Sequence, residues 1–152
     1  MPERAPAFVY TIYIAASAET VWNGLIDQEV TKDYWGHHNR SAWKPGSRWE
    51  HVRTDGSGKV DIVGKVVEID PPKRLVTTWA SPESENDPEK VSRVVYELAP
   101  AGADTKLTVT HSELEAGSGM LAGITAGWPA VLSNLKSKLE TGKVMTNLWT
   151  KE

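Results

Sequence analysis

The sequence predicts a single α+β domain in which a curved, antiparallel, six-stranded sheet wraps around a long C-terminal helix. Three observations predict this fold. Residues 127–142, GWPAVLSNLKSKLETG, place their large apolar side chains on one helical stripe about 100° wide. Five strand-like segments separated by turn residues precede this helix. Two short helical segments follow an additional strand near the N-terminus, so the sheet is interrupted after its first strand.

The N-terminal third is expected to form that first strand and the two helices. Residues 8–15 are rich in β-branched and aromatic side chains, which favours a strand. Ser17 is placed to cap a first helix, which carries Glu19 in its first turn. The apolar face of this helix consists of Val21, Trp22, Leu25 and Ile26. A second helix is expected over 29–35, followed by a loop with the sequence GHHNRSAWKPGS.

The remainder of the chain is expected to alternate between strands and turns before the last helix. The expected strands are 48–53, 59–69, 74–80, 91–99 and 105–112. TDGSG is typical of a hairpin, DPPK of a tight connection, and SPESENDPE of an acidic surface loop. The last helix is expected to begin near Ser118, and Pro129 within it is a candidate kink. Its apolar stripe holds Met120, Leu121, Ile124, Trp128, Val131, Leu132, Leu135 and Leu139.

Length and composition limit the possible classes of protein. A chain of 152 residues is one domain, 1–152, with a core over about 8–142 and a tail over 143–152. Hydrophobic residues at 39% and charged residues at 24% are typical of a globular protein. A net charge of −3 and a pI near 5.8 argue against a nucleic-acid partner. The absence of cysteine excludes disulfides and thiolate chemistry.

The N-terminal apolar run is interpreted as a strand and not as a signal peptide. The leader MPERAP carries one acid and one base in place of a positively charged segment. No stretch approaches the roughly 20 apolar residues that a membrane span needs. We therefore expect a soluble, cytoplasmic protein without a membrane partner.

A candidate site follows from strand parity. Alternate residues of three neighbouring strands face the last helix, and a curved sheet cannot contact a straight helix everywhere. A gap between them, closed at one end by the two short helices, is therefore expected. The residues predicted to line it are Trp35, Trp79, Tyr96, His111, Ile124, Trp128 and Leu132. Core packing is the alternative for the tryptophans, and a buried His111 needs a partner from either the protein or a ligand.

Other chemistry has little support in the residues. No serine, histidine and carboxylate share a catalytic spacing, so no catalytic residue is predicted. His37, His38 and His51 offer three nitrogens without a recognised metal-binding spacing, so we expect neither a metal nor a cofactor. TDGSGK lacks the helix start of a phosphate loop, and the acidic run from Glu83 to Glu89 is interpreted as a solvated loop.

Four segments in order resemble a known superfamily over Tyr10 to about Gly142. They are SAETVWNGLID followed by YWG, then GKVVEIDPPKRLVTTW, TKLTVTHSEL and GWPAVLSNLKSKLETG. The chain resembles the SRPBCC (START-like, helix-grip) superfamily, in the branch named after the C-terminal domain of the activator of heat-shock-protein-90 ATPase. This resemblance implies the helix-grip fold. The superfamily includes lipid and hormone binders, polyketide cyclases, hydroxylase subunits and co-chaperone domains.

The residues and the resemblance leave three functions open. The first is a non-catalytic module that binds a small hydrophobic or aromatic molecule. The second is a protein-interaction or stress-response module. A chaperone partner is less favoured there, because the co-chaperone has a separate N-terminal client domain for which this chain has no room. The third is a cyclase- or hydrolase-type enzyme. The tail KVMTNLWTKE carries Val144, Met145, Leu148 and Trp149, which either fold back onto the sheet or join a dimer interface, so monomer and homodimer both stay open.

Overall fold

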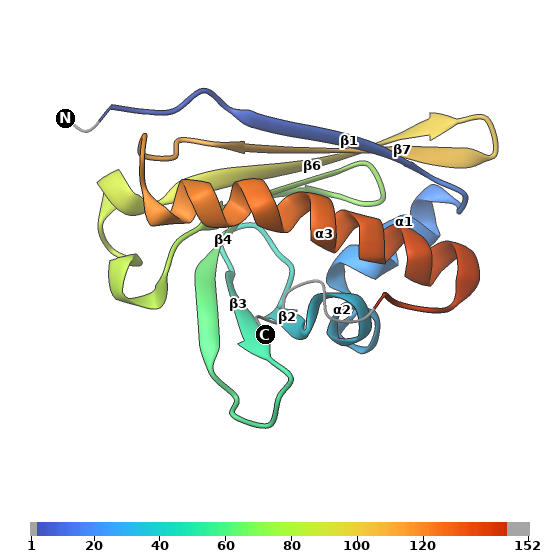
Figure 1. Ribbon diagram of the computed structural model, residues 1–152, viewed down its shortest axis with the longest axis horizontal. Coiled ribbons are helices and arrows are strands. Elements are labelled where there is room, and N and C mark those ends of the chain that lie inside the picture. The colour runs from blue at the N-terminus through green and yellow to red at the C-terminus, as the bar shows by residue number, and fades with distance from the viewer. Residues whose placement is uncertain (1–2, 146–152) are drawn as a thin grey trace.

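The computed structural model describes residues 3–145 and consists of one sheet, three α-helices and two short 3₁₀ turns (Figure 1). All neighbouring strands are antiparallel, and their spatial order is β1-β7-β6-β5-β4-β3-β2. The strands are β1 Phe8–Ile14, β2 His37–Ser41, β3 Arg48–Arg53, β4 Val60–Asp70, β5 Arg74–Trp79, β6 Ser92–Ala101 and β7 Asp104–Ser112. The helical segments are α1 Ala18–Ile26, α2 Gln28–Trp35, η1 Pro82–Ser84, η2 Pro88–Lys90 and α3 Gly119–Thr141.

The prediction of six strands is wrong by one, because part of the expected loop GHHNRSAWKPGS forms β2. This strand contains no large apolar residue, so the alternation that marks a half-buried strand is hidden. Polar contacts to β3 and β4 hold it instead. His51 Nδ1 donates to the buried Asn39 Oδ1 over 2.6 Å, Arg40 pairs with Glu50 at 2.7 Å, and His37 Nε2 lies 2.7 Å from Asp61 Oδ2. The other six strands are confirmed, with ends that move by at most two residues.

Caps define the two short helices. Ser17 Oγ accepts from the Thr20 N–H over 3.2 Å, as predicted for the start of α1. Asp27 ends α1 and starts α2, since its Oδ1 accepts from the Glu29 N–H over 2.9 Å. Gly36 ends α2 with φ 69°, a left-handed conformation that lets the chain turn directly into β2.

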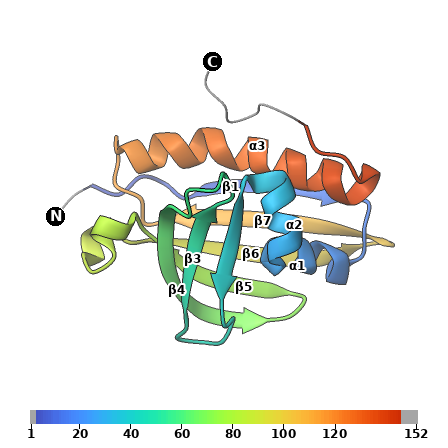
Figure 2. The same cartoon turned by 90° about the horizontal axis from the view of Figure 1, so that it is seen from below.

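Helix α3 lies across the face of the curved sheet, with α1 and α2 beside its C-terminal half (Figures 1 and 2). It begins as predicted after Ser118, whose Oγ accepts from the Leu121 N–H, and it continues through Pro129 to Thr141. Its residues Leu132 and Leu135 are fully buried against the sheet and the other helices. The predicted inward positions of β5, β6 and β7 are all buried: Leu75, Thr77, Trp79, Val94, Tyr96, Leu98, Leu107, Val109 and His111.

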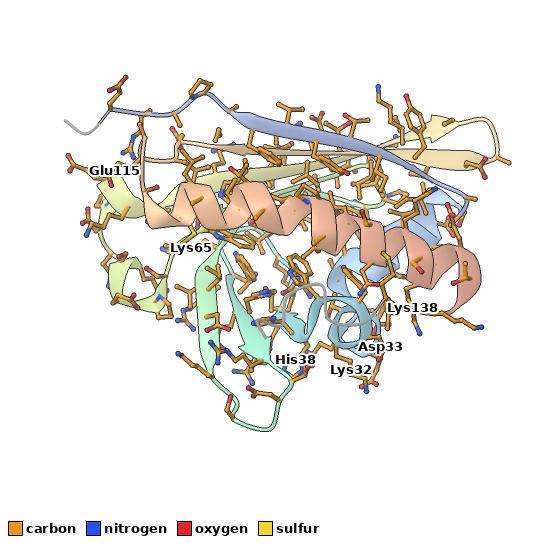
Figure 3. The ribbon with its side chains drawn as sticks, viewed as in Figure 1. Lys32, Asp33, His38, Lys65, Glu115 and Lys138 are labelled. Carbon is orange, nitrogen blue, oxygen red and sulfur yellow. The ribbon has the colours of Figure 1, made fainter. Side chains whose placement is uncertain are left out.

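Polar contacts fix α3 against its neighbours. Asn134 Nδ2 donates to the Tyr34 carbonyl over 2.9 Å, and Lys138 lies 3.1 Å from Asp33 at the contact between α3 and α2 (Figure 3). At the edge strand β1, Lys136 Nζ donates to the Tyr13 carbonyl over 2.7 Å. The Ala15 N–H donates to Glu140 Oε2 over the same distance. These two bonds cover part of a sheet edge that would otherwise expose unpaired backbone groups.

The ladder between β4 and β5 is interrupted at Gly64. The Trp49 indole crosses this position, and its Nε1–H donates to the Thr78 carbonyl over 2.9 Å. A Cβ at Gly64 would overlap both the indole nitrogen and that carbonyl. Gly64 is therefore the opening that lets Trp49 reach β5 and pack 5.4 Å from Trp79, measured between ring centroids.

Two further expectations concern membrane-spanning helices and the C-terminal tail. Within residues 3–145, no helix has the length and apolar character required to cross a bilayer. The predicted contacts of Leu148 and Trp149 lie outside the described residues.

Candidate functional site: an aromatic groove beside α3

A groove of about 400 Å³ lies between the N-terminal half of α3, helix α2 and the strands β4 and β5. Its lining residues are Trp35, Ile62, Trp79, Gly119, Met120, Gly123, Ile124, Gly127, Trp128 and Val131. None of these ten residues carries a charge. A cleft of this size with apolar and aromatic walls is typical of sites that bind small molecules.

A larger hollow, of about 580 Å³, lies between α2, β2 and the β3–β4 turn and has a polar lining. Its three cations are already neutralised, because Lys32 pairs with Glu29, Arg40 with Glu50 and Arg53 with Asp61. The apolar groove is therefore the stronger candidate.

Trp79 is the centre of the aromatic cluster that forms the floor of the groove. Its ring centroid lies 5.4 Å from that of His111, 5.5 Å from Trp128 and 5.9 Å from His51. Trp128 in turn lies 5.7 Å from Trp35, so three tryptophans from α2, β5 and α3 form a continuous aromatic surface. Tilted and edge-to-face contacts of this kind stabilise the cluster beyond simple burial.

Trp79 also leaves a hydrogen bond unmade. The residue is 6% exposed, and its Nε1–H has no acceptor within the part of the chain that the structure describes. A buried donor without a partner costs on the order of 1–3 kcal/mol. The nitrogen itself is covered, so an acceptor in the groove would remove that cost only if the indole turned toward it.

His111 lies behind the floor, and both of its ring nitrogens are engaged by the protein. The Trp128 Nε1–H, which can only donate, lies 3.0 Å from Nδ1, so Nδ1 is the acceptor. Nε2 therefore carries the proton and donates to Ser92 Oγ over 2.8 Å, and the Ser92 hydroxyl donates to the Trp79 carbonyl over 2.9 Å. Burial lowers the pKa of His111 to about 4, so the ring is neutral at pH 7.

His51 is a second buried histidine below the groove. Besides its bond to Asn39, its ring packs 4.8 Å from Trp35 and stacks on His37 with centroids 4.0 Å apart. Burial and the neighbouring His37 hold the pKa of His51 well below its usual range. Among residues 3–145, no three histidine, cysteine or acidic side chains are grouped so that they would hold a metal ion.

The seven residues predicted to line the site separate into two groups. Trp35, Trp79, Ile124 and Trp128 line the groove. Behind them, Tyr96 packs edge-on against Trp128, and burial raises the pKa of its hydroxyl above the usual range. Leu132 is buried in the core with His111. Direct contact of Tyr96, His111 or Leu132 with a ligand stays a prediction.

Several lining residues were not predicted. Ile62 follows an irregular stretch of β4, so strand parity gave no reliable assignment for it. Gly119, Gly123 and Gly127 have no side chain, so a pattern of apolar side chains does not include them. Their regular spacing of four is nevertheless visible in the sequence and places them on one helical face.

Comparisons with known proteins agree with this fold. The solution structure of the Aha1 dimer from Colwellia psychrerythraea is 26% identical, with a TM-score of 0.75, over 91% of this chain and 99% of that one. PFC0360w, an HSP90 activator from Plasmodium falciparum, is 24% identical, with a TM-score of 0.72, over 91% and 97% of the two chains. CalU16 from Micromonospora echinospora is 20% identical, with a TM-score of 0.69, over 93% and 88%.

No curated protein matches the chain. A family model does match, over residues 15–140, which include every strand except β1, all but the last residue of α3 and the whole lining of the groove. The chain therefore belongs to the family of Activator of Hsp90 ATPase homolog 1-like proteins.

Proposed function

We propose that this protein binds a small, neutral, apolar molecule in the groove beside α3. The observation that carries the proposal is an uncharged groove with three tryptophans in its walls and a buried, unpartnered N–H on one of them. A charged ligand would lose its hydration without gaining an ion pair from the lining residues, which disfavours it.

The proposed role is binding and not catalysis. General acid–base catalysis needs a titratable group within hydrogen-bond reach of the reacting atoms. Of the two histidines buried beside the groove, His51 donates to Asn39 through Nδ1, and His111 directs both nitrogens to Trp128 and Ser92. His111 supports the groove by holding the indole of Trp128 in place.

A titration with Nile red, a neutral and flat fluorophore, tests the proposal. We expect saturable binding to the parent, with a change in tryptophan emission. Met120→Glu should weaken binding about tenfold or more, because it places a carboxylate at the groove. The first turn of a helix tolerates an acidic residue, so this variant should fold.

Ala122→Glu is the matched control. It adds the same charge to the same turn of α3, at an exposed position that does not line the groove. Its affinity should equal that of the parent. Weak, non-saturable binding to the parent, or equal loss in both variants, would contradict the proposal.

A second candidate function, docking to a chaperone of the Hsp90 class, is supported by the family membership and by the relative from Plasmodium falciparum that is named as an HSP90 activator. Its test is the ATPase rate of such a chaperone with and without this protein. Stimulation that Met120→Glu leaves unchanged would assign that activity to a surface away from the groove. Size-exclusion chromatography would show whether this chain is a dimer, as its relative from Colwellia psychrerythraea is.

A further inference from the structure

The N-terminal half of α3 contains glycine at every fourth position along the groove. Gly119, Gly123 and Gly127 all line it, and a period of four keeps them on one face of the helix. Two of them lie inside the helix, where glycine is the poorest former after proline. Selection for a stable helix would replace them with alanine.

Packing within the chain does not explain these glycines. A Cβ added at any of the three positions would meet no atom of the described chain within 4 Å. None of the three has a positive φ, so backbone conformation does not require glycine either. This contrasts with Gly64, where a Cβ would overlap Thr78 and Trp49. The space beside the helix backbone is therefore open in the protein as it stands.

An independent observation in the same groove indicates what fills that space. Trp79 lines the same groove, is more than nine-tenths buried, and has a covered Nε1–H without an acceptor among the described residues. An open helix face supplies a flat surface, and the indole supplies one hydrogen-bond donor. The stripe from Gly119 to Gly127 is about 12 Å long, at 1.5 Å per residue.

Resting on the proposed function, we infer that the groove selects an elongated, flat, neutral molecule that carries a hydrogen-bond acceptor. Its flat face lies against the backbone of α3 at the glycine stripe. The Trp79 indole turns toward the groove on binding, and the ligand's acceptor, such as a ring carbonyl, accepts from its Nε1–H, which is covered in the free protein. Gly123 and Gly127 determine which shapes enter, and Trp79 determines which polarity is preferred.

Replacing the glycines by alanine should raise the stability of the protein and weaken its binding of a ligand. Gly123→Ala and Gly127→Ala should each raise the melting temperature by up to about 3 °C, because alanine is the better helix former and has free space. Each should weaken Nile red binding by about 5- to 100-fold, since a methyl group separates the ligand from the helix. Ala126→Gly, at an exposed position outside the groove lining, should lower the melting temperature and leave the affinity unchanged.

The donor is tested with two molecules of the same shape. Fluorenone and fluorene share a flat three-ring skeleton, and only fluorenone has a carbonyl acceptor. In competition against Nile red, the parent should prefer fluorenone by about 3- to 10-fold, the effect of one hydrogen bond. Trp79→Phe removes the donor and keeps an aromatic ring, so this preference should disappear.

The outcomes separate the inference from the proposed function. If the parent shows no saturable binding at all, the proposed function fails and the inference fails with it. If the parent binds and both glycine variants bind equally well, or fluorene matches fluorenone, only the inference is overturned. It is also overturned if the glycine variants keep their affinity for fluorenone and instead dissociate a dimer, which would assign the stripe to a second copy of the chain.

Discussion

Protonation of His111 should make the stability of this protein depend on pH. The folded chain holds the ring neutral, with a pKa of about 4, whereas an unfolded histidine titrates near 6.5. Between these values the unfolded chain binds a proton that the folded chain does not. Stability therefore falls as the pH decreases from about 6.5 to 4, and the loss is complete below about pH 4.

The size of the effect follows from the two pKa values. A difference of about 2.5 units corresponds to roughly 3 kcal/mol in total, of which roughly 2–3 kcal/mol is lost by pH 4.5. The geometry gives the same direction. A proton on Nδ1 would face the Trp128 Nε1–H over 3.0 Å, so two donors would meet and the bond would be lost.

Urea denaturation of the parent and of His111→Gln between pH 4.5 and 7.5 measures this contribution. The variant loses the titrating ring, so its free energy of unfolding should fall less steeply with decreasing pH. His51, whose pKa is also lowered, and the carboxylates contribute equally to both curves and cancel in the difference. Ser92→Ala is the control, because it removes one partner of His111 and keeps the imidazole. Its curve should lie below that of the parent with the same slope. Parallel curves for the parent and His111→Gln would refute the reasoning.

Three substitutions and one control substitution test the fold by thermal or urea denaturation. Leu135→Asp buries a charge without a partner at a fully buried position of α3 and should abolish cooperative unfolding, whereas Ala126→Asp, on the exposed face, should be nearly silent. Gly64→Ala should cost about 3 kcal/mol or more, because a Cβ there displaces the indole bonded to the Thr78 carbonyl; a loss below about 1 kcal/mol would contradict the described ladder. Glu140→Ala leaves an exposed backbone N–H at the end of β1 to water and should cost about 0.5–1.5 kcal/mol, and an unchanged unfolding midpoint would show that this bond contributes nothing.

Ala126 is a better control position than Ser137, which the sequence favours. Ser137 lies opposite the apolar stripe in a helical projection and is predicted to be silent toward Asp. In the structure Ser137 is half-buried, and its hydroxyl donates to the Lys143 carbonyl over 2.8 Å, where the chain turns back after α3. A helical projection contains no information about that return, so Ser137 would test two contacts at once.

Strand parity and helical period predict which face of an element is buried, and here they did so for Trp79 and Trp128. They do not predict how far along the helix axis two elements meet. Ile124 and Leu132 lie on the same stripe, about 12 Å apart along α3, and only Ile124 lines the groove. The hydrogen-bond partners of His111 could not be predicted from the sequence either, since Ser92 and Trp128 are 19 and 17 residues away in the chain. Long-range hydrogen bonds depend on register, which a single sequence specifies only loosely.

The anchoring contacts of α3 in its C-terminal half explain why its N-terminal half tolerates glycines. Its C-terminal half anchors the helix through the buried Leu132 and Leu135, the Asn134 bond to α2 and the Lys136 bond to β1. Helices in proteins derive most of their stability from such tertiary contacts and not from intrinsic propensity. The anchored half therefore holds the N-terminal half in a helical conformation that its own residues favour only weakly. The glycines of that half present bare backbone to the groove, so substituting Gly123 or Gly127 should change the proposed affinity with little loss of stability, whereas the buried Ile124 and Trp128 beside them belong to the core.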